Sequence, residues 1–299
     1  MPRRLCAAVF AVGAFVACSH LLSAAPDRAS EILARARQAI GGEARLKAVT
    51  SLSLKARSRS EVAGSSQAFT NLEMHFLLPD KFLVTRDWPL SFLRRIEGFN
   101  GNQLIEQRLS WGLWADIGFG DGSKEALARQ MASRQRECVR YLAAWLLTVP
   151  EQYDVRFTDA GEAQIADGRA DVVDAKGAND FAARLFFDKQ THRLLMLSYR
   201  EPPQPAPALT ASPQDVKPPE KGEPLFKSIE GPASKAPETQ MHLGKYRADD
   251  GIVFPHRVRN ESEGLLEEWE ISRFKVNPRL GLKQFERKRL PNGPAAWLR

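Results

Sequence analysis

Two stretches with the same alternation decide the fold class of this chain. Residues 51–57 are SLSLKAR and residues 71–76 are NLEMHF, so every second side chain is apolar and those between are mostly polar. A period of two puts the apolar side chains on one face of a β-strand and leaves the other face to water, which is typical of antiparallel sheets. The same reasoning predicts further strands over 82–86, 103–109, 153–158, 169–175, 182–187, 194–199, 241–248, 253–261 and 265–276.

Two segments have the helical period instead. Apolar residues recur at helical spacing over 31–40, just before a pair of glycines, and a longer helix is predicted over 123–147, ended by Pro150. The stretch 111–122 is rich in glycine and aromatic residues and predicts a long loop. The expected fold class is therefore mainly β with helices (α+β).

The first 25 residues have the pattern of an export signal. Arg3 and Arg4 precede an apolar run over 5–17, and small residues follow at 23–25. We expect cleavage to a soluble exported protein. Two alternatives are an uncleaved N-terminal anchor and lipidation of Cys18, because residues 15–18 resemble a bacterial lipobox.

Composition narrows the class of protein. The chain has 299 residues, 43% hydrophobic and 26% charged, which excludes a wholly disordered chain. After residue 25 no apolar stretch approaches the ~18 residues of a membrane span, which excludes a polytopic membrane protein. Two of the three cysteines lie in the predicted signal, so Cys138 cannot form an intramolecular disulfide in the folded part.

The positive charge is concentrated near the two ends of the chain. The net charge is +7, of which the signal supplies +2 and residues 273–299 supply +7, so the remaining part carries −2. A domain that binds nucleic acid would carry its basic residues over a folded face. We therefore expect no nucleic-acid partner.

A proline-rich segment interrupts the predicted strands. Residues 201–237 contain ten of the 19 prolines and few large apolar residues, so they cannot bury enough surface to order themselves. We expect a disordered insertion in a single domain over 26–287, followed by a basic tail over 288–299. A domain boundary is the alternative interpretation of the same segment.

No motif for catalysis is found. The chain has no HExxH, CxxC, GxSxG, Walker or GxGxxG pattern, so we expect no enzyme, no cofactor and no metal. A hydrolase whose site has no such motif is the alternative. His242 and His256 lie on neighbouring predicted strands and could meet, or could be ordinary strand residues. Nearby arginines could lower the pKa of the Cys138 thiol, or the cysteine could be half-buried in its helix.

The order of the turn motifs resembles one family. The segments that carry this resemblance are LKAVTSL at 46–52, LPDKF at 78–82, GFNGN at 98–102, ADGR at 166–169, FDKQTHRLL at 187–195, DDGIVFPHRV at 249–258, VNPRL at 276–280 and Phe285. Over residues 30–287 they are similar to the bacterial LolA-like, outer-membrane lipoprotein-sorting superfamily. The resemblance implies a curved antiparallel sheet, an incomplete β-barrel, with helices against its concave side and an apolar concave face that holds acyl chains.

The resemblance sets the functional expectation. We expect a non-enzymatic, monomeric periplasmic carrier or binder of lipid or lipoprotein acyl chains, soluble or anchored to the outer membrane through Cys18. The alternative is an envelope structural or sensor protein that uses the same fold to bind a protein partner. The candidate cavity lining is Phe76, Phe82, Trp111, Trp114, Phe186 and Leu195.

The basic tail offers a second contact. Arg287, Lys288, Arg289 and Trp297 could touch an anionic membrane surface, at about 1 kcal/mol for each basic residue near the surface. A soluble tail without a partner is the alternative.

The proline-rich segment gives the first testable prediction. Limited proteolysis should cut first between Glu201 and Pro237, and deletion of most of this segment should leave the Tm nearly unchanged, because few apolar residues are available to bind the fold. Mass spectrometry of the fragments and a thermal melt of the deletion variant measure both effects. A large fall in Tm would show that the segment packs on the domain.

Overall fold

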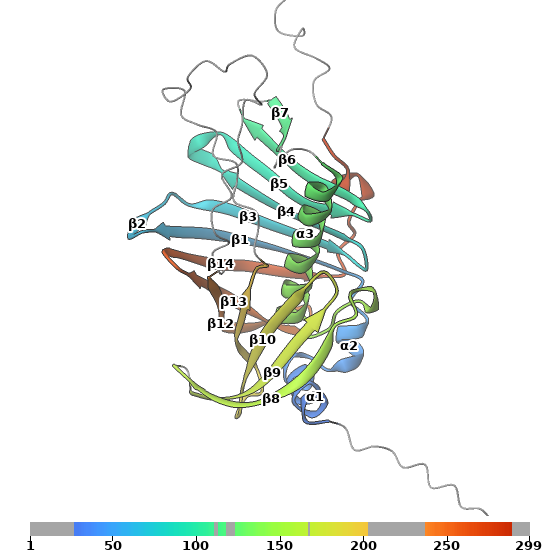
Figure 1. The fold of residues 1–299 in the computed structure, drawn as a ribbon, viewed down its shortest axis with the longest axis vertical. Coiled ribbons are helices and arrows are strands. Elements are labelled where there is room, and N and C mark those ends of the chain that lie inside the picture. The colour runs from blue at the N-terminus through green and yellow to red at the C-terminus, as the bar shows by residue number, and fades with distance from the viewer. Residues whose placement is uncertain (1–26, 111–112, 118–122, 167, 203–236, 289–299) are drawn as a thin grey trace, which may run out of the picture.

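One antiparallel sheet organises the chain. The computed structural model describes residues 27–110, 113–117, 123–166, 168–202 and 237–288, and its 14-stranded sheet has the order β7-β6-β5-β4-β3-β1-β14-β13-β12-β11-β10-β9-β8, with β2 beside β1 (Figure 1). The strands are β1 (Ser51–Val62), β2 (Ser65–Ser66), β3 (Thr70–Leu77), β4 (Lys81–Trp88), β5 (Leu93–Asn100), β6 (Gln103–Ser110), β7 (Leu113–Asp116), β8 (Arg156–Ile165), β9 (Gly168–Gly177), β10 (Phe181–Asp188), β11 (Leu194–Arg200), β12 (Glu238–Asp249), β13 (Ile252–Ser262) and β14 (Leu265–Val276).

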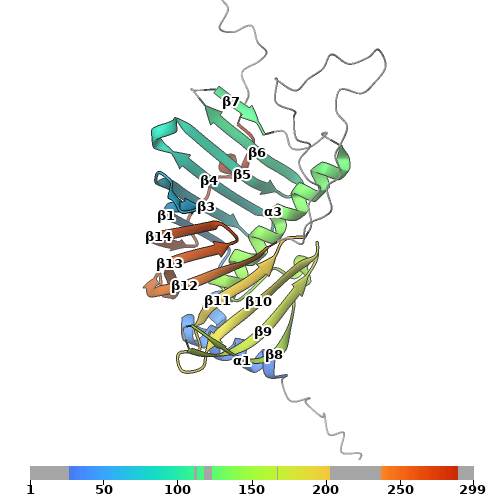
Figure 2. The same cartoon turned by 60° about the vertical axis from the view of Figure 1, so that its left-hand side comes forward.

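Most neighbouring strands are also consecutive in sequence, and the main exception is the pair β1–β14. Their antiparallel pairing, with Leu54 opposite Phe274, joins an N-terminal half made of β1 to β7 to a C-terminal half made of β8 to β14. The strands at the two ends of the sheet are β7 and β8, and the chain passes between them through α3 (Lys124–Trp145). The sheet curves around this helix (Figure 2).

The remaining helices are short. They are α1 (Arg28–Ile40), α2 (Glu43–Lys47), and the single turns η1 (Pro89–Ser91), η2 (Glu151–Tyr153) and η3 (Leu282–Phe285). The Asp27 side chain caps α1 by accepting from Ser30 N at 2.7 Å, and α1 contacts β8, β9 and β13. Among the described residues, no helix is long and apolar enough to cross a membrane.

The main core lies on the concave face. It combines the buried side of α1, the C-terminal half of α3 and every second residue of the strands, including Leu54, Met74 and Leu185. Burying such faces is the main favourable contribution to folding, at about 25 cal/mol per Å² of apolar surface. The expected fold class, a mainly β, open antiparallel sheet with helices on its concave side, is confirmed.

A smaller core lies on the convex face. Leu83, Ile96 and Ile105 point away from α3 and are covered by Phe285 of η3, whose side chain is fully buried. The chain reaches this face after a turn at Asn277, whose Oδ1 accepts from Thr50 N at 2.8 Å and whose Nδ2 donates to Ala48 O at 3.1 Å. The C-terminal segment therefore packs on the outside of β4 to β6.

The sheet is continuous across the proline-rich segment. Arg200 of β11 is opposite Glu238 of β12 in the same antiparallel ladder, so the strands before and after the segment are neighbours. Residues 203–236, on which the prediction of a disordered insertion falls, lie outside the described residues, as do the predicted signal with Cys18 and residues 289–299 of the tail.

Three strands were not predicted, namely the two-residue β2, β5 and β7. β7 lies within the stretch 111–122 that was expected to be a loop, and β5 has no clear alternation because Arg95 and Glu97 occupy its concave face. A buried carboxylate at a position that normally holds an apolar residue hides the period of two from a hydropathy pattern.

A close approach of two strands generates the second prediction. Gly98 in β5 has φ 153°, and a Cβ added there would lie 2.1 Å from Phe82 O of β4. Gly98→Ala should therefore force the two strands apart and lower the free energy of unfolding by about 3 kcal/mol or more. Urea denaturation measures this effect.

Gly244→Ala is the matched control, because Gly244 also lies in a strand, β12, and an added Cβ would meet nothing within 4 Å. Equal stability changes for the two variants would contradict the steric argument.

Candidate ligand-binding face

α3 divides the concave face into two environments. Ser123 caps the helix by accepting from Ala126 N at 3.1 Å, and the first turns carry exposed side chains such as Leu127, which is 50% exposed. From Cys138 to Leu147 every residue is buried. The C-terminal end of α3 is therefore enclosed by the sheet, whereas its N-terminal end is partly exposed.

Aromatic side chains surround the enclosed end. Trp145 stacks on Tyr141 with ring centroids 4.8 Å apart, and its edge meets Phe76 at 5.8 Å and Phe274 at 5.6 Å. Phe76 in turn lies 4.8 Å from Phe82. Each such pair contributes about 0.5–1.5 kcal/mol beyond its buried area, so this aromatic cluster fixes the C-terminal half of α3 firmly to the sheet.

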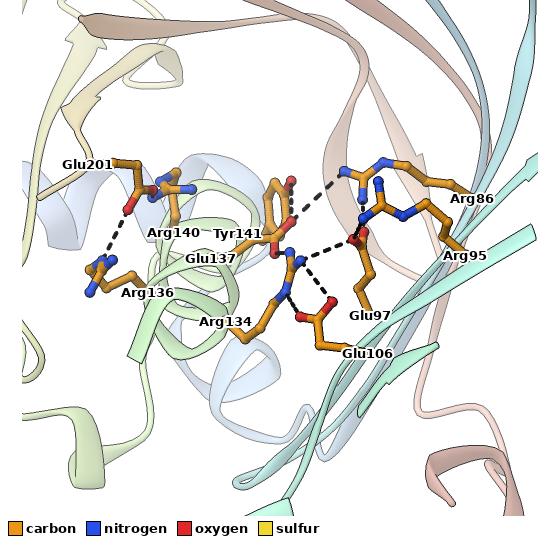
Figure 3. A network of polar contacts seen from close by, with 10 residues as sticks. All are labelled: Arg86, Arg95, Glu97, Glu106, Arg134, Arg136, Glu137, Arg140, Tyr141 and Glu201. Carbon is orange, nitrogen blue, oxygen red and sulfur yellow. Dashed lines mark hydrogen bonds and ion pairs between the residues drawn. The ribbon is translucent and has the colours of Figure 1, made fainter. Parts of the chain in front are cut away.

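Ion pairs hold the next part of the helix. Arg134 lies 2.5 Å from Glu106 of β6, 3.1 Å from Glu97 of β5 and 2.7 Å from Glu137 one turn along α3 (Figure 3). Arg86 of β4 and Arg95 of β5 approach Glu97 at 2.8 and 3.1 Å. The side chains of Glu97 and Glu106 are only 6% exposed, so this is a buried ionic network.

The network shifts the pKa values of two of its carboxyl groups in opposite directions. Burial raises the pKa of Glu106 above its ordinary value, and the opposing effect of Arg134 does not cancel it. Burial acts in the same direction on Glu137, but Arg134 and Arg86 outweigh it and lower the pKa of that carboxyl. The Arg134 guanidinium remains charged because the carboxylates raise its pKa despite burial.

A second clamp joins α3 to the end of β11. Glu201 accepts from Arg136 Nε at 3.1 Å and pairs with Arg140 (Figure 3). The Arg140 guanidinium also lies 3.5 Å from the centre of the Tyr199 ring, a cation–π contact. Glu201 is the first residue of the proline-rich segment, so this segment starts at the surface of α3.

The predicted cavity residues separate into three groups. Phe76 and Phe82 lie on the concave face, and both have 0% exposure within the aromatic cluster. Phe186 belongs to a cluster with Val172 and Met196, whereas Leu185 and Phe187 belong to the main core. The Phe186 side chain therefore lies on the convex face, so the expectation that it lines a cavity on the concave face is corrected.

Leu195 is displaced by a bulge. Phe186 pairs with Met196 and Phe187 pairs with Leu194, so Leu195 is the extra residue and is only half-buried. A bulge changes which face later residues occupy, and hydropathy alone does not reveal it. The side chains of Trp111 and Trp114 lie outside the described residues.

The first residues of the predicted membrane-contact tail are bound to the domain. Arg287 forms an ion pair with Asp116 of β7, while Lys288 N donates to Gln107 Oε1 at 2.6 Å and Lys288 O accepts from Gln107 Nε2 at 3.0 Å. These contacts seat residues 287 and 288 at the β6–β7 edge. Arg289 and Trp297 lie beyond the described residues.

The alternatives for reactive side chains are now decided. Cys138 is buried, and burial together with Glu137 raises the pKa of its thiol, which is the direction opposite to activation. His242 is opposite Arg259 in the sheet, and His256 instead places Nε2 3.0 Å from Asp249 Oδ2. In the described part of the chain, no group of three or more His, Cys, Asp or Glu side chains could hold a metal ion.

A groove opens on the convex face beside the C-terminal segment. It has a volume of about 600 Å³, and Leu83 and Ile96 contribute to its lining between charged groups that include Lys55, Glu73 and Lys288. Lys55 and Glu73 pair with each other at 3.2 Å. The groove is thus amphipathic and carries charges of both signs.

Sequence reasoning did not identify the ionic network. Its helix residues belong to the run 134–138, in which the arginines lie close to Cys138 but far in sequence from their carboxylate partners on the sheet. Their partners on β4, β5 and β6 lie 28 or more residues away in sequence. The local signal was Glu97 between Ile96 and Gly98, and this pattern does not identify the residue with which the glutamate pairs.

No protein-family model matches this chain, and no curated protein sequence matches it. Solved structures with a similar fold include a DUF1329 family protein from Desulfovibrio piger ATCC 29098, with a TM-score of 0.49, 10% sequence identity and coverage of 87% of this chain and 98% of that chain. A LolA superfamily protein from Nitrosomonas europaea has a TM-score of 0.46 and 13% identity, covering 87% of this chain and 97% of that chain. At these identities each likeness concerns the fold alone.

The buried network generates the third prediction. Arg134→Met keeps most of the side-chain volume but leaves Glu97 and Glu106 short of their shared cation, so it should lower the free energy of unfolding by about 3–5 kcal/mol. Chemical denaturation measures the change. Adding Glu106→Gln to this variant should restore part of the loss, because one uncompensated charge is then removed.

Arg129→Met is the control on the same helix, since Arg129 is exposed. A loss below about 1 kcal/mol for Arg134→Met, the range of an exposed ion pair, would mean that water already shields these charges.

Proposed function

We propose that this chain is an exported, non-enzymatic binding protein of the cell envelope that holds the acyl chain of a lipid or lipoprotein against its concave face, beneath α3. The observation that carries the proposal is the aromatic cluster under α3, formed around Phe76, Phe82 and Trp145. Fully burying one methylene contributes about 0.8 kcal/mol, so a chain of about a dozen carbons could bind there without a charged contact.

Binding at this place requires movement of α3, because Phe76 and Phe82 are fully covered. The two halves of the helix differ in how they are held. Apolar contacts fix the C-terminal half, whereas ion pairs to Glu97 and Glu106 hold the region around Arg134. A buried ion pair contributes little net stability because desolvation offsets its attraction. We therefore expect the N-terminal half of α3 to lift, with the acyl chain entering over β4 to β6.

The N-terminal signal pattern supports export to the periplasm, with lipid anchoring at Cys18 as the alternative. The tail could add contact with an anionic membrane. Because Arg287 and Lys288 are held at the β6–β7 edge, residues 289–299 start from the same half of the sheet that α3 would uncover.

Binding of a protein partner is the second candidate. The complete burial of Phe76 and Phe82 favours it, because a filled concave side leaves no room for a ligand while α3 stays in place. The amphipathic groove of about 600 Å³ on the convex face would then be the surface that the partner binds.

A fatty acid brominated along its chain tests the carrier proposal, because bromine quenches tryptophan fluorescence only at short range. Saturable quenching by the purified protein at micromolar concentration is expected, and Trp145→Phe should remove most of it because Trp145 lies in the aromatic cluster. Trp297→Phe is the matched control and should leave the fatty-acid signal unchanged, while it and truncation after Glu286 should weaken sedimentation with anionic vesicles.

Absence of saturable quenching by protein with an unchanged circular dichroism spectrum would reject the acyl-chain proposal and favour a protein partner. Trp269 also lies beside α3, with its ring 5.8 Å from that of Tyr141. Quenching that persists in the double variant Trp145→Phe, Trp269→Phe would therefore place the ligand away from α3.

A further inference from the structure

A polar pocket lies where five chain segments from both halves of the sheet meet. Its walls come from α3, η2 and three turns, those joining β3 to β4, β5 to β6 and β9 to β10, and its volume is about 380 Å³. This volume is near the lower end of the ~300–1,000 Å³ range of small-molecule sites. The polar lining residues are Asp80, Asn102, Gln135, Gln152, Tyr153 and Asn179.

Side-chain amides dominate the lining. Asn179 Nδ2 donates to Gln135 Oε1 at 2.7 Å, and Gln152 Nε2 donates to Pro79 O at 3.1 Å. These bonds orient the amides and leave Gln135 Nε2 as a donor and the oxygens of Asn179 and Gln152 as acceptors. Asn102 adds one more donor and acceptor pair to the lining.

The charge of the pocket is low and of one sign. Asp80 is its single ionisable carboxylate among the described lining, and one oxygen of that group pairs with Lys81 at 2.8 Å, which leaves the second oxygen as an acceptor. No lysine or arginine of the described chain lines the pocket. Phosphate and carboxylate ligands need such cations, so the pocket disfavours an anion, and its polar lining disfavours an acyl chain.

Tyr153 of η2 lines the pocket, and its hydroxyl is enclosed. The residue is 4% exposed, and its hydroxyl is buried without a hydrogen-bond partner in the described part of the chain, although Cys138 and Gln152 are its near neighbours. Burial raises the pKa of this phenol above its ordinary value of about 10, at which the hydroxyl is already protonated at neutral pH. A buried unpaired hydroxyl is costly unless a ligand or a water completes it.

We propose that this pocket binds one unit of a neutral saccharide. Each sugar hydroxyl both donates and accepts a hydrogen bond, and the amides, the free oxygen of Asp80 and the Tyr153 hydroxyl offer both kinds of group around one small volume. The ligand would contact Gln135 on α3 and Asn102 and Asn179 on turns from the two halves of the sheet. This site lies beside the acyl-binding face and shares α3 with it, because Gln135 follows Arg134 in the part of the helix that would lift.

Calorimetric titration and ¹⁵N NMR with a β-1,4-linked N-acetylglucosamine trimer and with maltotriose test the proposal. Saturable binding of at least one probe is expected, with shifts at Asn102, Gln135 and Asn179. Tyr153→Phe should weaken binding about tenfold, the loss of one hydrogen bond, without lowering the Tm, because the removed hydroxyl has no partner in the fold. Asn102→Ala should also weaken binding.

Asn71→Ala is the matched control, because Asn71 lines the convex groove instead, and it should bind as the parent does. Three results would overturn the proposal. The first is no binding of either probe at up to about 10 mM, a concentration that nearly saturates a site with a Kd of about 1 mM. The second is unchanged affinity in both Tyr153→Phe and Asn102→Ala, and the third is a Tm several degrees lower in Tyr153→Phe, which would give the hydroxyl a structural role. Fatty-acid quenching is measured separately, so failure here leaves the acyl-chain proposal intact.

Discussion

Enclosure of the C-terminal half of α3 is the constraint on which the rest of the structure depends. A single open sheet can bury only what covers its faces, and here residues 138–147 are buried on all sides because the sheet curves around them. The same helix carries the chain from β7 to β8, the two ends of the sheet. The β1–β14 pairing then brings the two halves together behind it, so that one helix fills the concave side of both.

This arrangement makes the two halves of α3 unequal. Apolar burial is nearly independent of orientation and strong, whereas the buried ionic network around Arg134 is directional and gains little over solvation. The helix is therefore anchored at Trp145 and held more reversibly at Glu97 and Glu106. Such a division provides a physical basis for an opening on one side without unfolding of the core, and it is compatible with either an acyl chain or a protein partner as the trigger.

The other surfaces differ from the concave face in chemistry. The convex groove combines apolar lining residues with charges of both signs, and the pocket between α3 and the turns is lined by amides with one carboxylate. A mainly β scaffold with long hairpins places its turns at the rims of the sheet, and residues distant in sequence meet there. Separate ligands could therefore be held by different faces of one domain without sharing residues.

The sequence by itself determined the class of fold and most of its strands. The alternation in residues 51–57 and 71–76, together with the helical spacing over 31–40, is a local property that any one-sided sheet or helix must have. The alternation did not predict β5, where Glu97 is buried, and it did not reveal the bulge at Leu195 that shifts parity. Both effects arise from contacts made across strands, and local hydropathy contains no record of them.

Only the tertiary structure decided which side chains meet. It moved Phe186 to the face opposite Phe76, joined Arg134 to carboxylates on two strands, and seated Arg287 beside Asp116. The sequence alone could not separate a filled core from a ligand cavity, because both require the same inward-facing apolar residues. The positions of α3 and of the strand registers distinguish them, because these set the space that remains after the side chains have packed, and that depends on the whole fold at once.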